Sequence, residues 1–169
     1  MFGGRSIMDA VASRERRAGK LAAAAPYILF VALGLTTTLP FLARPELLHD
    51  SFWINHVWLD QYAMLLGDGN LLPRWLPLSH NGLGSSVFYY YPPLSFYIAA
   101  LFRLAGASLW GAELLAFATG IAAAGATMYR WLGPGKRWSW AGAAVFAVSP
   151  YHLFDFVQRG ALAESVAIA

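Results

Sequence analysis

Residues 21–42 read LAAAAPYILFVALGLTTTLPFL, and this stretch decides the class of fold. It contains no charged side chain, and as a helix it would be about 33 Å long, enough to cross a hydrocarbon core of about 30 Å. A cleaved signal peptide has an apolar core of only about 7–15 residues and ends in small residues. This run is longer and ends in Phe41-Leu42-Ala43. We therefore expect a retained transmembrane anchor.

The composition also indicates a membrane protein. Hydrophobic residues make up 58% of the chain and charged residues 12%, whereas soluble domains are about 25% charged. The chain has 12 Lys and Arg against 9 Asp and Glu, and the excess lies before the anchor. Such a basic cluster predicts a cytoplasmic N-terminus, residues 1–20, rather than a nucleic-acid interface. Because the chain has no cysteine, a thiol nucleophile, a disulfide and a thiolate metal site are excluded.

Two further apolar segments, residues 110–131 and 138–154, are predicted to cross the membrane. The segment 93–106 is only about 20 Å long as a helix and is interrupted by Arg103, so it is predicted to lie in the interface. If it spanned instead, Arg130, Lys136 and Arg137 would face outward, against the positive-inside tendency. The loop 132–137 is therefore placed in the cytoplasm. The predicted fold class is an all-α membrane protein with about three transmembrane helices.

The remaining segments are predicted to lie on the extracytoplasmic side. Residues 43–109 form the first external loop, with juxtamembrane helices at 50–66 and 93–106. The helix 50–66 is apolar on two faces, which suits a helix at the membrane surface packed against others. Residues 155–169 begin a second external segment that ends within a helical pattern, so we expect a fragment of a longer protein. Gly and Ala at 120–126 favour close helix packing in lipid.

The first candidate functional residue is Asp50, which follows the anchor and stands next to His49. Its position suits a helix N-cap, which contributes about 1 kcal/mol to stability. Alternatively, burial beside Trp53 and Trp58 would raise the pKa of this carboxyl and make it a general base for an acceptor hydroxyl. The sequence leaves both interpretations open.

Other polar residues could bind substrate. Arg74 and Arg159, the latter five residues before Glu164, are candidates for binding a phosphate, although each could instead pair with a carboxylate or a lipid headgroup. Tyr91, in a Tyr-Tyr-Tyr-Pro-Pro run, could anchor the interface or line an acceptor groove. The histidines are scattered without metal-ligand spacing, so no metal site is predicted. No phosphate loop, nucleophile elbow or dinucleotide fingerprint occurs.

Several motifs in order resemble one family of bacterial multi-pass membrane proteins, the glycosyltransferases of GT-C type, and within it the group called 6-pyruvoyl-tetrahydropterin synthase-related membrane proteins. The motifs are His49-Asp50, Trp58 with Gln61, Gly69-Asn70-Leu71-Leu72-Pro73-Arg74-Trp75, Gly82-Leu83-Gly84, Phe88-Tyr89-Tyr90-Tyr91-Pro92-Pro93, Ser149-Pro150-Tyr151-His152 and Arg159-Gly160-Ala161-Leu162-Ala163-Glu164. Pterin chemistry would need clustered histidines for zinc, which the sequence lacks.

The resemblance implies an enzyme of the bacterial inner membrane that transfers a sugar from a polyprenyl-phosphate carrier to an extracytoplasmic glycan, lipid or protein. It implies Asp50 as catalytic base, with Arg159 and Glu164 in the second external loop contributing to the site. We add Arg74, His49 and Tyr91 as substrate-binding candidates. No cofactor beyond the lipid-linked donor is expected, and a need for a divalent metal stays open. The competing hypothesis is a non-catalytic membrane scaffold or a transporter.

Overall fold

The computed structural model describes residues 4–47 and 51–169, and for residues 4–12 and Glu46 it describes the backbone alone. Every regular element in these residues is helical, as the sequence predicts, and the only strand-like pairing there is an isolated bridge. In chain order the elements are α1 (Gly4–Thr38), η1 (Leu39–Leu42), η2 (Pro45–Leu47), α2 (Phe52–Gly67), α3 (Ser79–Gly82), η3 (Val87–Tyr89), α4 (Leu94–Leu104), α5 (Leu109–Leu132), α6 (Ser139–Ala147), α7 (Pro150–Phe154), η4 (Asp155–Arg159) and α8 (Leu162–Ala167).

Two segments of the described residues are long and apolar enough to cross a membrane. The first, Ser13–Leu42, comprises most of α1 with the turn η1, and it leaves large apolar side chains such as Leu21, Ile28 and Val31 exposed. The second, Leu109–Leu132, is α5, most of which is buried within the molecule. Two helices of this length and composition are consistent with association with a membrane.

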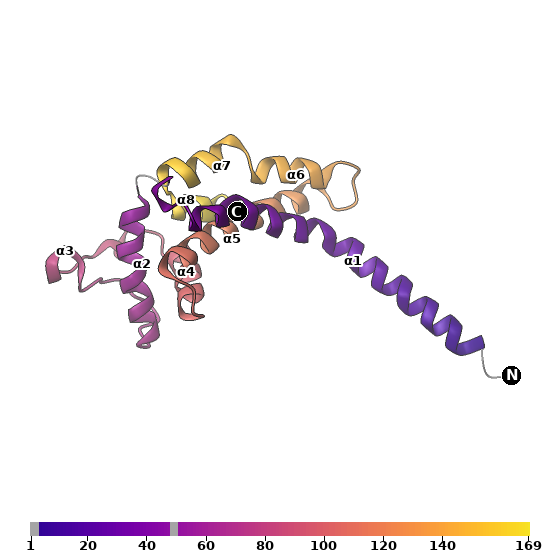
Figure 1. Cartoon of the computed structure of the whole chain (residues 1–169), viewed down its shortest axis with the longest axis horizontal. Coiled ribbons are helices and arrows are strands. Elements are labelled where there is room, and N and C mark those ends of the chain that lie inside the picture. Colours follow the sequence, from indigo (N-terminus) through magenta and orange to yellow (C-terminus); the bar gives the residue numbers. More distant parts are fainter. Residues whose placement is uncertain (1–3, 48–50) are drawn as a thin grey trace.

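Small residues allow α1 and α5 to pack closely. A Cβ atom added to Gly34 of α1 would lie 2.4 Å from the backbone oxygen of Ala118 in α5. A Cβ atom added to Gly125 would lie 2.8 Å from the ring of Phe30. Figure 1 shows the second half of α1 beside α5, while its first half projects away from the rest of the molecule. The Gly and Ala content of α5 therefore has the packing role that the sequence predicts.

The predicted third span, residues 138–154, is not one continuous helix. It consists of α6 and α7, separated at Ser149, whose backbone is extended (φ −59°, ψ 153°). Pro150 explains the break, because it has no N–H to continue the helix and disfavours the helical conformation in the residue before it. Figure 1 shows α6 and α7 following one another, and α6 packs against α5.

The other helix boundaries differ in detail from the predicted ones. The basic stretch predicted as a separate segment, residues 1–20, is helical from Gly4 and continuous with the anchor. The helix predicted at 50–66 is observed as α2, and the one predicted at 93–106 is observed as α4. Figure 1 shows both helices lying across the direction of α5.

An aromatic core joins these transverse helices to the long ones. Phe52 of α2 contacts Phe117 of α5 and Phe156 of η4, with ring centroids 5.2 Å and 6.0 Å apart. All three rings are fully buried, and burying one such side chain contributes about 1.5–3 kcal/mol to stability. The core therefore fixes the start of α2 against the segment that follows α7.

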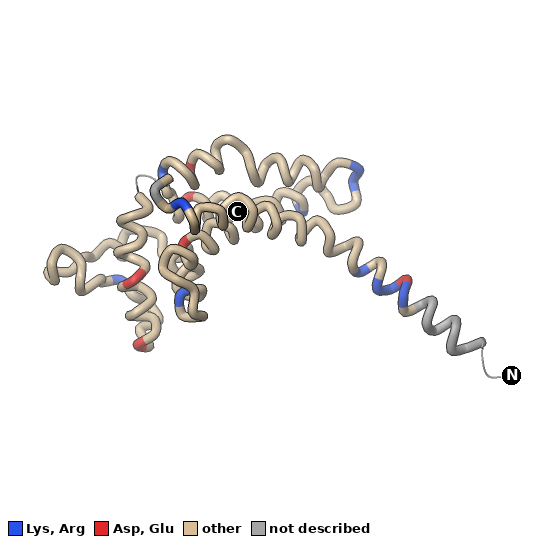
Figure 2. Tube along the Cα trace, viewed as in Figure 1, with Lys and Arg blue, Asp and Glu red and all other residues tan. Residues whose placement is uncertain are grey.

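Charged residues lie at opposite ends of this arrangement. Figure 2 shows Lys and Arg along the early part of α1 and at the turn between α5 and α6. That turn contains Lys136 and Arg137, the latter lying over the ring of Trp138 with 5.3 Å between its guanidinium carbon and the ring centroid. Asp155 and Arg159 are the first and last residues of η4, and the Arg159 carbonyl accepts a hydrogen bond from Ser51 at the start of α2.

Candidate functional site

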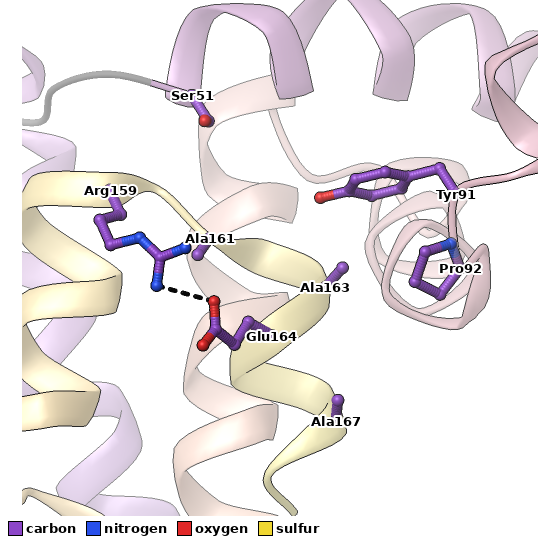
Figure 3. Close-up of a pocket in the computed structure, with 8 residues that line it drawn as sticks. All are labelled: Ser51, Tyr91, Pro92, Arg159, Ala161, Ala163, Glu164 and Ala167. Carbon is purple, nitrogen blue, oxygen red and sulfur yellow. Dashed lines mark ion pairs between the residues drawn. The ribbon is translucent and has the colours of Figure 1, made fainter.

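A cavity of about 440 Å³ lies where α2, the Tyr91-Pro92 segment and α8 meet. Figure 3 shows its lining, which combines one ion pair, one tyrosine, one serine and several small residues. The residues are Ser51, Tyr91, Pro92, Arg159, Ala161, Ala163, Glu164 and Ala167. Three of the predicted substrate-binding residues, Tyr91, Arg159 and Glu164, are thus brought together from segments far apart in the sequence.

The backbone around Arg159 is fixed to the start of α2. The Ser51 N–H donates to the Arg159 carbonyl at 3.1 Å, and the buried Asn55 side chain donates to the Gly160 carbonyl at 2.7 Å. Gly160 has φ +58°, and a Cβ atom there would lie 2.8 Å from the Phe52 backbone nitrogen. Only glycine combines this left-handed conformation with such a close approach.

The Arg159 guanidinium is shared by two carboxylates. Its Nη1 atom lies 2.6 Å from Asp155 Oδ1 and 2.8 Å from Glu164 Oε2, and the Tyr151 hydroxyl donates to Glu164 Oε1. The hydrogen bond from Tyr151 and the charge of Arg159 lower the pKa of Glu164, so this carboxylate is ionised at neutral pH. The formal charges of one guanidinium and two carboxylates sum to minus one.

Tyr91 forms the opposite wall of the cavity. Its ring packs edge-on against Trp58, with the centroids 5.4 Å apart. Figure 3 shows its hydroxyl pointing across the cavity toward the side that carries Arg159. Burial, and secondly the nearby Glu164 charge, raise the pKa of Tyr91, so the hydroxyl keeps its proton and can donate a hydrogen bond.

A second cavity of about 470 Å³ lies on the other side of Tyr91 and Pro92, which line both. It contains Arg74, whose guanidinium carbon lies 5.6 Å from the centroid of the Tyr89 ring. No carboxylate of the described residues forms an ion pair with Arg74. Tyr62 also lines this cavity, and its buried hydroxyl has no hydrogen-bond partner among the described residues. Arg74 and Arg159 therefore occupy neighbouring cavities and do not share one.

Gln61 holds the loop that carries Arg74. Its side-chain oxygen accepts from the Leu78 N–H at 2.8 Å, and its amide nitrogen donates to Ser79 Oγ at 3.1 Å. Further along, Leu76 and Ser85 exchange two backbone hydrogen bonds of 2.9 Å, which close the loop on itself. The loop therefore has a defined conformation against α2.

One polar pair escaped the sequence analysis. Glu113 of α5 is fully buried, and its Oε2 atom lies 3.0 Å from His56 Nδ1 of α2, while Oε1 has no hydrogen-bond partner among the described residues. The rings of Trp53 and Trp110 contact the His56 ring. A lone carboxylate in an apolar segment was the available signal, but its partner could be identified only from the packing of α2 against α5.

The predicted catalytic base Asp50 and its neighbour His49 lie outside the described residues. Asp50 is bonded to Ser51, which is described and lines the first cavity. Ser51 itself occupies the N-cap position of α2 without a capping side-chain hydrogen bond. Within residues 13–47 and 51–169, apart from Glu46, no three His, Asp or Glu side chains come together as metal ligands.

Comparisons with protein-family models, with curated proteins and with solved structures gave no significant match to the chain, so the candidate site has to be interpreted from its own geometry.

Proposed function

We propose that the chain is the substrate-binding part of a membrane glycosyltransferase of GT-C type, which uses a polyprenyl-phosphate sugar. The observation that supports this most directly is the pair of cavities separated by Tyr91 and Pro92. One contains an arginine without a carboxylate partner among the described residues, and the other contains a hydrogen-bonded cluster with excess negative charge. Two adjoining cavities of different charge suit a donor and an acceptor.

The donor phosphate is assigned to the Arg74 cavity. A guanidinium that lies over an aromatic ring and has no described carboxylate partner retains its charge for an anion. The aromatic and proline side chains around it suit the first isoprene units of the carrier. The acceptor is assigned to the cavity of Arg159 and Glu164, so that Tyr91 stands between the two substrates.

In the proposed reaction an acceptor hydroxyl oxygen bonds to the anomeric carbon of the donor sugar. The bond from that carbon to the phosphate oxygen breaks, and the polyprenyl phosphate leaves with the electron pair. Arg74 would stabilise the charge that develops on the phosphate. The acceptor proton passes to a carboxylate, for which the resemblance to GT-C enzymes indicates Asp50.

For the topology we propose a protein of the bacterial inner membrane that crosses it three times, by α1, α5 and the pair α6–α7. Its N-terminus lies in the cytoplasm. The basic residues at the start of α1 and at the α5–α6 turn support this, because cytoplasmic loops are rich in Lys and Arg. Under this arrangement α2, α4 and both cavities lie on the extracytoplasmic side.

The direct test measures sugar transfer from a radiolabelled polyprenyl-phosphate sugar by the protein, encoded by its complete reading frame, in membranes. We expect Arg74→Ala to lower the rate about 100-fold and Arg74→Lys to lower it less, because lysine keeps the charge but loses the planar geometry. Arg103→Ala, an exposed arginine on α4, is the control and should leave the rate unchanged.

Two results would contradict the proposal. One is that wild-type membranes show no transfer from any polyprenyl-phosphate sugar supplied, and the other is that Arg74→Ala transfers at the wild-type rate. The base is tested separately by Asp50→Asn, which should abolish transfer while leaving donor binding in place. An unchanged rate in Asp50→Asn would remove that residue from the mechanism but leave the assignment of Arg74 standing.

A transporter is the second candidate, and the buried Glu113 is the observation that favours it, because carboxylates inside spans serve proton and ion pathways. Glu113 lies in the second turn of α5, close to the end of the helix that meets α2. A pathway across the membrane would need further carboxylates or histidines along the span. The described residues of α5 beyond Glu113 contain none, so we favour the transferase.

A further inference from the structure

We infer that the cavity of Arg159 and Glu164 binds an uncharged saccharide and rejects an anionic one. The inference rests on the proposed function only for the statement that this saccharide is the acceptor. The binding preference itself follows from the charges, hydrogen-bonding groups and shape of the cavity.

The charge balance excludes an anion. The Nη1 atom of Arg159 is already hydrogen-bonded to Asp155 and close to Glu164, at 2.6 Å and 2.8 Å. An anion reaching the other guanidinium nitrogens would also approach the Glu164 carboxylate, whose lowered pKa keeps it ionised. The repulsion from the Glu164 carboxylate would offset the attraction of Arg159.

The polar groups of the cavity suit hydroxyl groups. The Tyr91 hydroxyl and the Ser51 hydroxyl can donate or accept, and the Glu164 carboxylate can accept. Sugar hydroxyls supply both donors and acceptors, so they can satisfy all three groups at once. An aliphatic ligand would offer no hydrogen bond to the Tyr91 and Ser51 hydroxyls, which is costly in a partly enclosed site.

The shape and the apolar part of the lining suit a sugar ring. The C–H face of a pyranose packs on aromatic and proline rings, and Tyr91 with Pro92 presents such a surface. On the other wall Ala163 and Ala167, four residues apart on α8, leave space because their side chains are small. The volume of about 440 Å³ lies within the range of about 300–1,000 Å³ usual for small-molecule sites.

The test compares galactotriose with trigalacturonate, two trisaccharides that differ in the oxidation of C6 to a carboxylate. Binding to the protein in detergent micelles is measured by saturation-transfer NMR and by competition. We expect galactotriose to bind at millimolar concentration and trigalacturonate to bind at least 10-fold more weakly. Glu164→Gln removes one negative charge, so it should reduce the difference in affinity between galactotriose and trigalacturonate.

The variant Ala163→Leu tests whether galactotriose binds in the cavity of Arg159 and Glu164. The larger side chain would fill the space beside Glu164 and should lower galactotriose affinity at least 10-fold. Ala105→Leu makes the same change at an exposed position at the end of α4 and should leave binding unchanged. Circular dichroism of both variants shows whether the helices are intact.

The inference is wrong if trigalacturonate binds as tightly as galactotriose, or if Ala163→Leu folds normally and binds galactotriose like the wild type. These measurements need no sugar transfer, so they separate the two proposals. A protein that binds galactotriose in this cavity but transfers no sugar would contradict the proposed function alone. A protein that transfers sugar only to anionic acceptors would contradict the inference alone.

Discussion

Glu113 is fully buried, and the His56 ring is the hydrogen-bond partner of its Oε2 atom. We predict that His56→Ala destabilises the fold by about 1–3 kcal/mol, because it leaves a fully buried carboxyl group without the hydrogen-bond partner of its Oε2 atom. The double variant His56→Ala/Glu113→Leu should recover much of that loss, because it leaves neither partner as a buried polar group without a hydrogen bond. Denaturant unfolding in detergent micelles, combined as a double-mutant cycle, measures the coupling. Strictly additive effects of the two changes would show that the pair is not coupled.

A second prediction at this scale concerns pH. Because the pKa of Glu164 is lowered in the folded protein, its pairing with Arg159 is fully present above the ordinary glutamate pKa of about 4.3 and is lost as the pH falls through the lowered value. Tyr151→Phe removes the hydrogen bond that contributes most to the shift. The pKa of Glu164, followed by carboxyl ¹³C NMR, should therefore rise in this variant. An unchanged titration would exclude Tyr151 as the cause.

The sequence identifies several residues of the candidate site but not all of the contacts between them. Arg159, Glu164 and Tyr91 were selected as binding candidates, and the structure places them around one cavity. Asp155 and Arg159 are four residues apart, a spacing that predicts an ion pair on a helix, but the sequence analysis did not use this signal. The sequence could not separate Arg74 from Arg159, because the wall between the cavities forms only when Tyr91 packs on Trp58.

At the scale of elements, the contact between α1 and α5 depends on the absence of a side chain at Gly34. We predict that Gly34→Ala destabilises the protein by about 1–3 kcal/mol, because its Cβ would meet the Ala118 carbonyl. Gly19→Ala in the same helix is the matched control, since a Cβ there has no atom within 4 Å. It should be neutral or stabilise by up to about 1 kcal/mol through helix propensity. Thermal unfolding in micelles compares the two, and equal effects would contradict the packing argument.

The elements also show where periodicity and length suffice for prediction. The helices at α2, α4 and α5 could be located because each has an uninterrupted run of helix-compatible residues between turn signals. The apolar composition of 138–154 predicts a single span. Pro150 divides this segment into α6 and α7, because proline cannot continue the preceding helix. The helix N-terminal to the anchor was missed because a basic stretch carries no apolar periodicity.

At the scale of the whole molecule, the proposed topology puts the α5–α6 turn and the loop around α3 on opposite sides of the membrane. The chain has no native cysteine, so single cysteines can report on this. We predict that a membrane-impermeant maleimide labels Leu83→Cys in intact spheroplasts but labels Pro134→Cys only after the membrane is opened. Leu83 is 83% exposed, so its accessibility does not limit labelling. Labelling of Pro134→Cys from outside would overturn the three-crossing arrangement.

The all-helical class could be predicted from composition and apolar runs alone. The contact between the start of α2 and the segment after α7 could not be predicted, because it joins residues about a hundred positions apart. Asn55 and Gly160 illustrate this, since neither a buried asparagine nor a glycine predicts its partner from local sequence. The cavities form only where these distant segments meet.

The hydrogen bond from Asn55 to the Gly160 carbonyl spans 105 residues, and this has a consequence for biosynthesis. At about 5–20 residues per second, residue 160 leaves the ribosome about 5–20 s after residue 55. During that interval Ser51 and Asn55 have no protein partner at this position and must be hydrated. The first cavity can therefore be completed only late in synthesis, and a ribosome that stalls between α5 and α7 would leave α2 packed on α4 and α5 without the wall that carries Arg159 and Glu164.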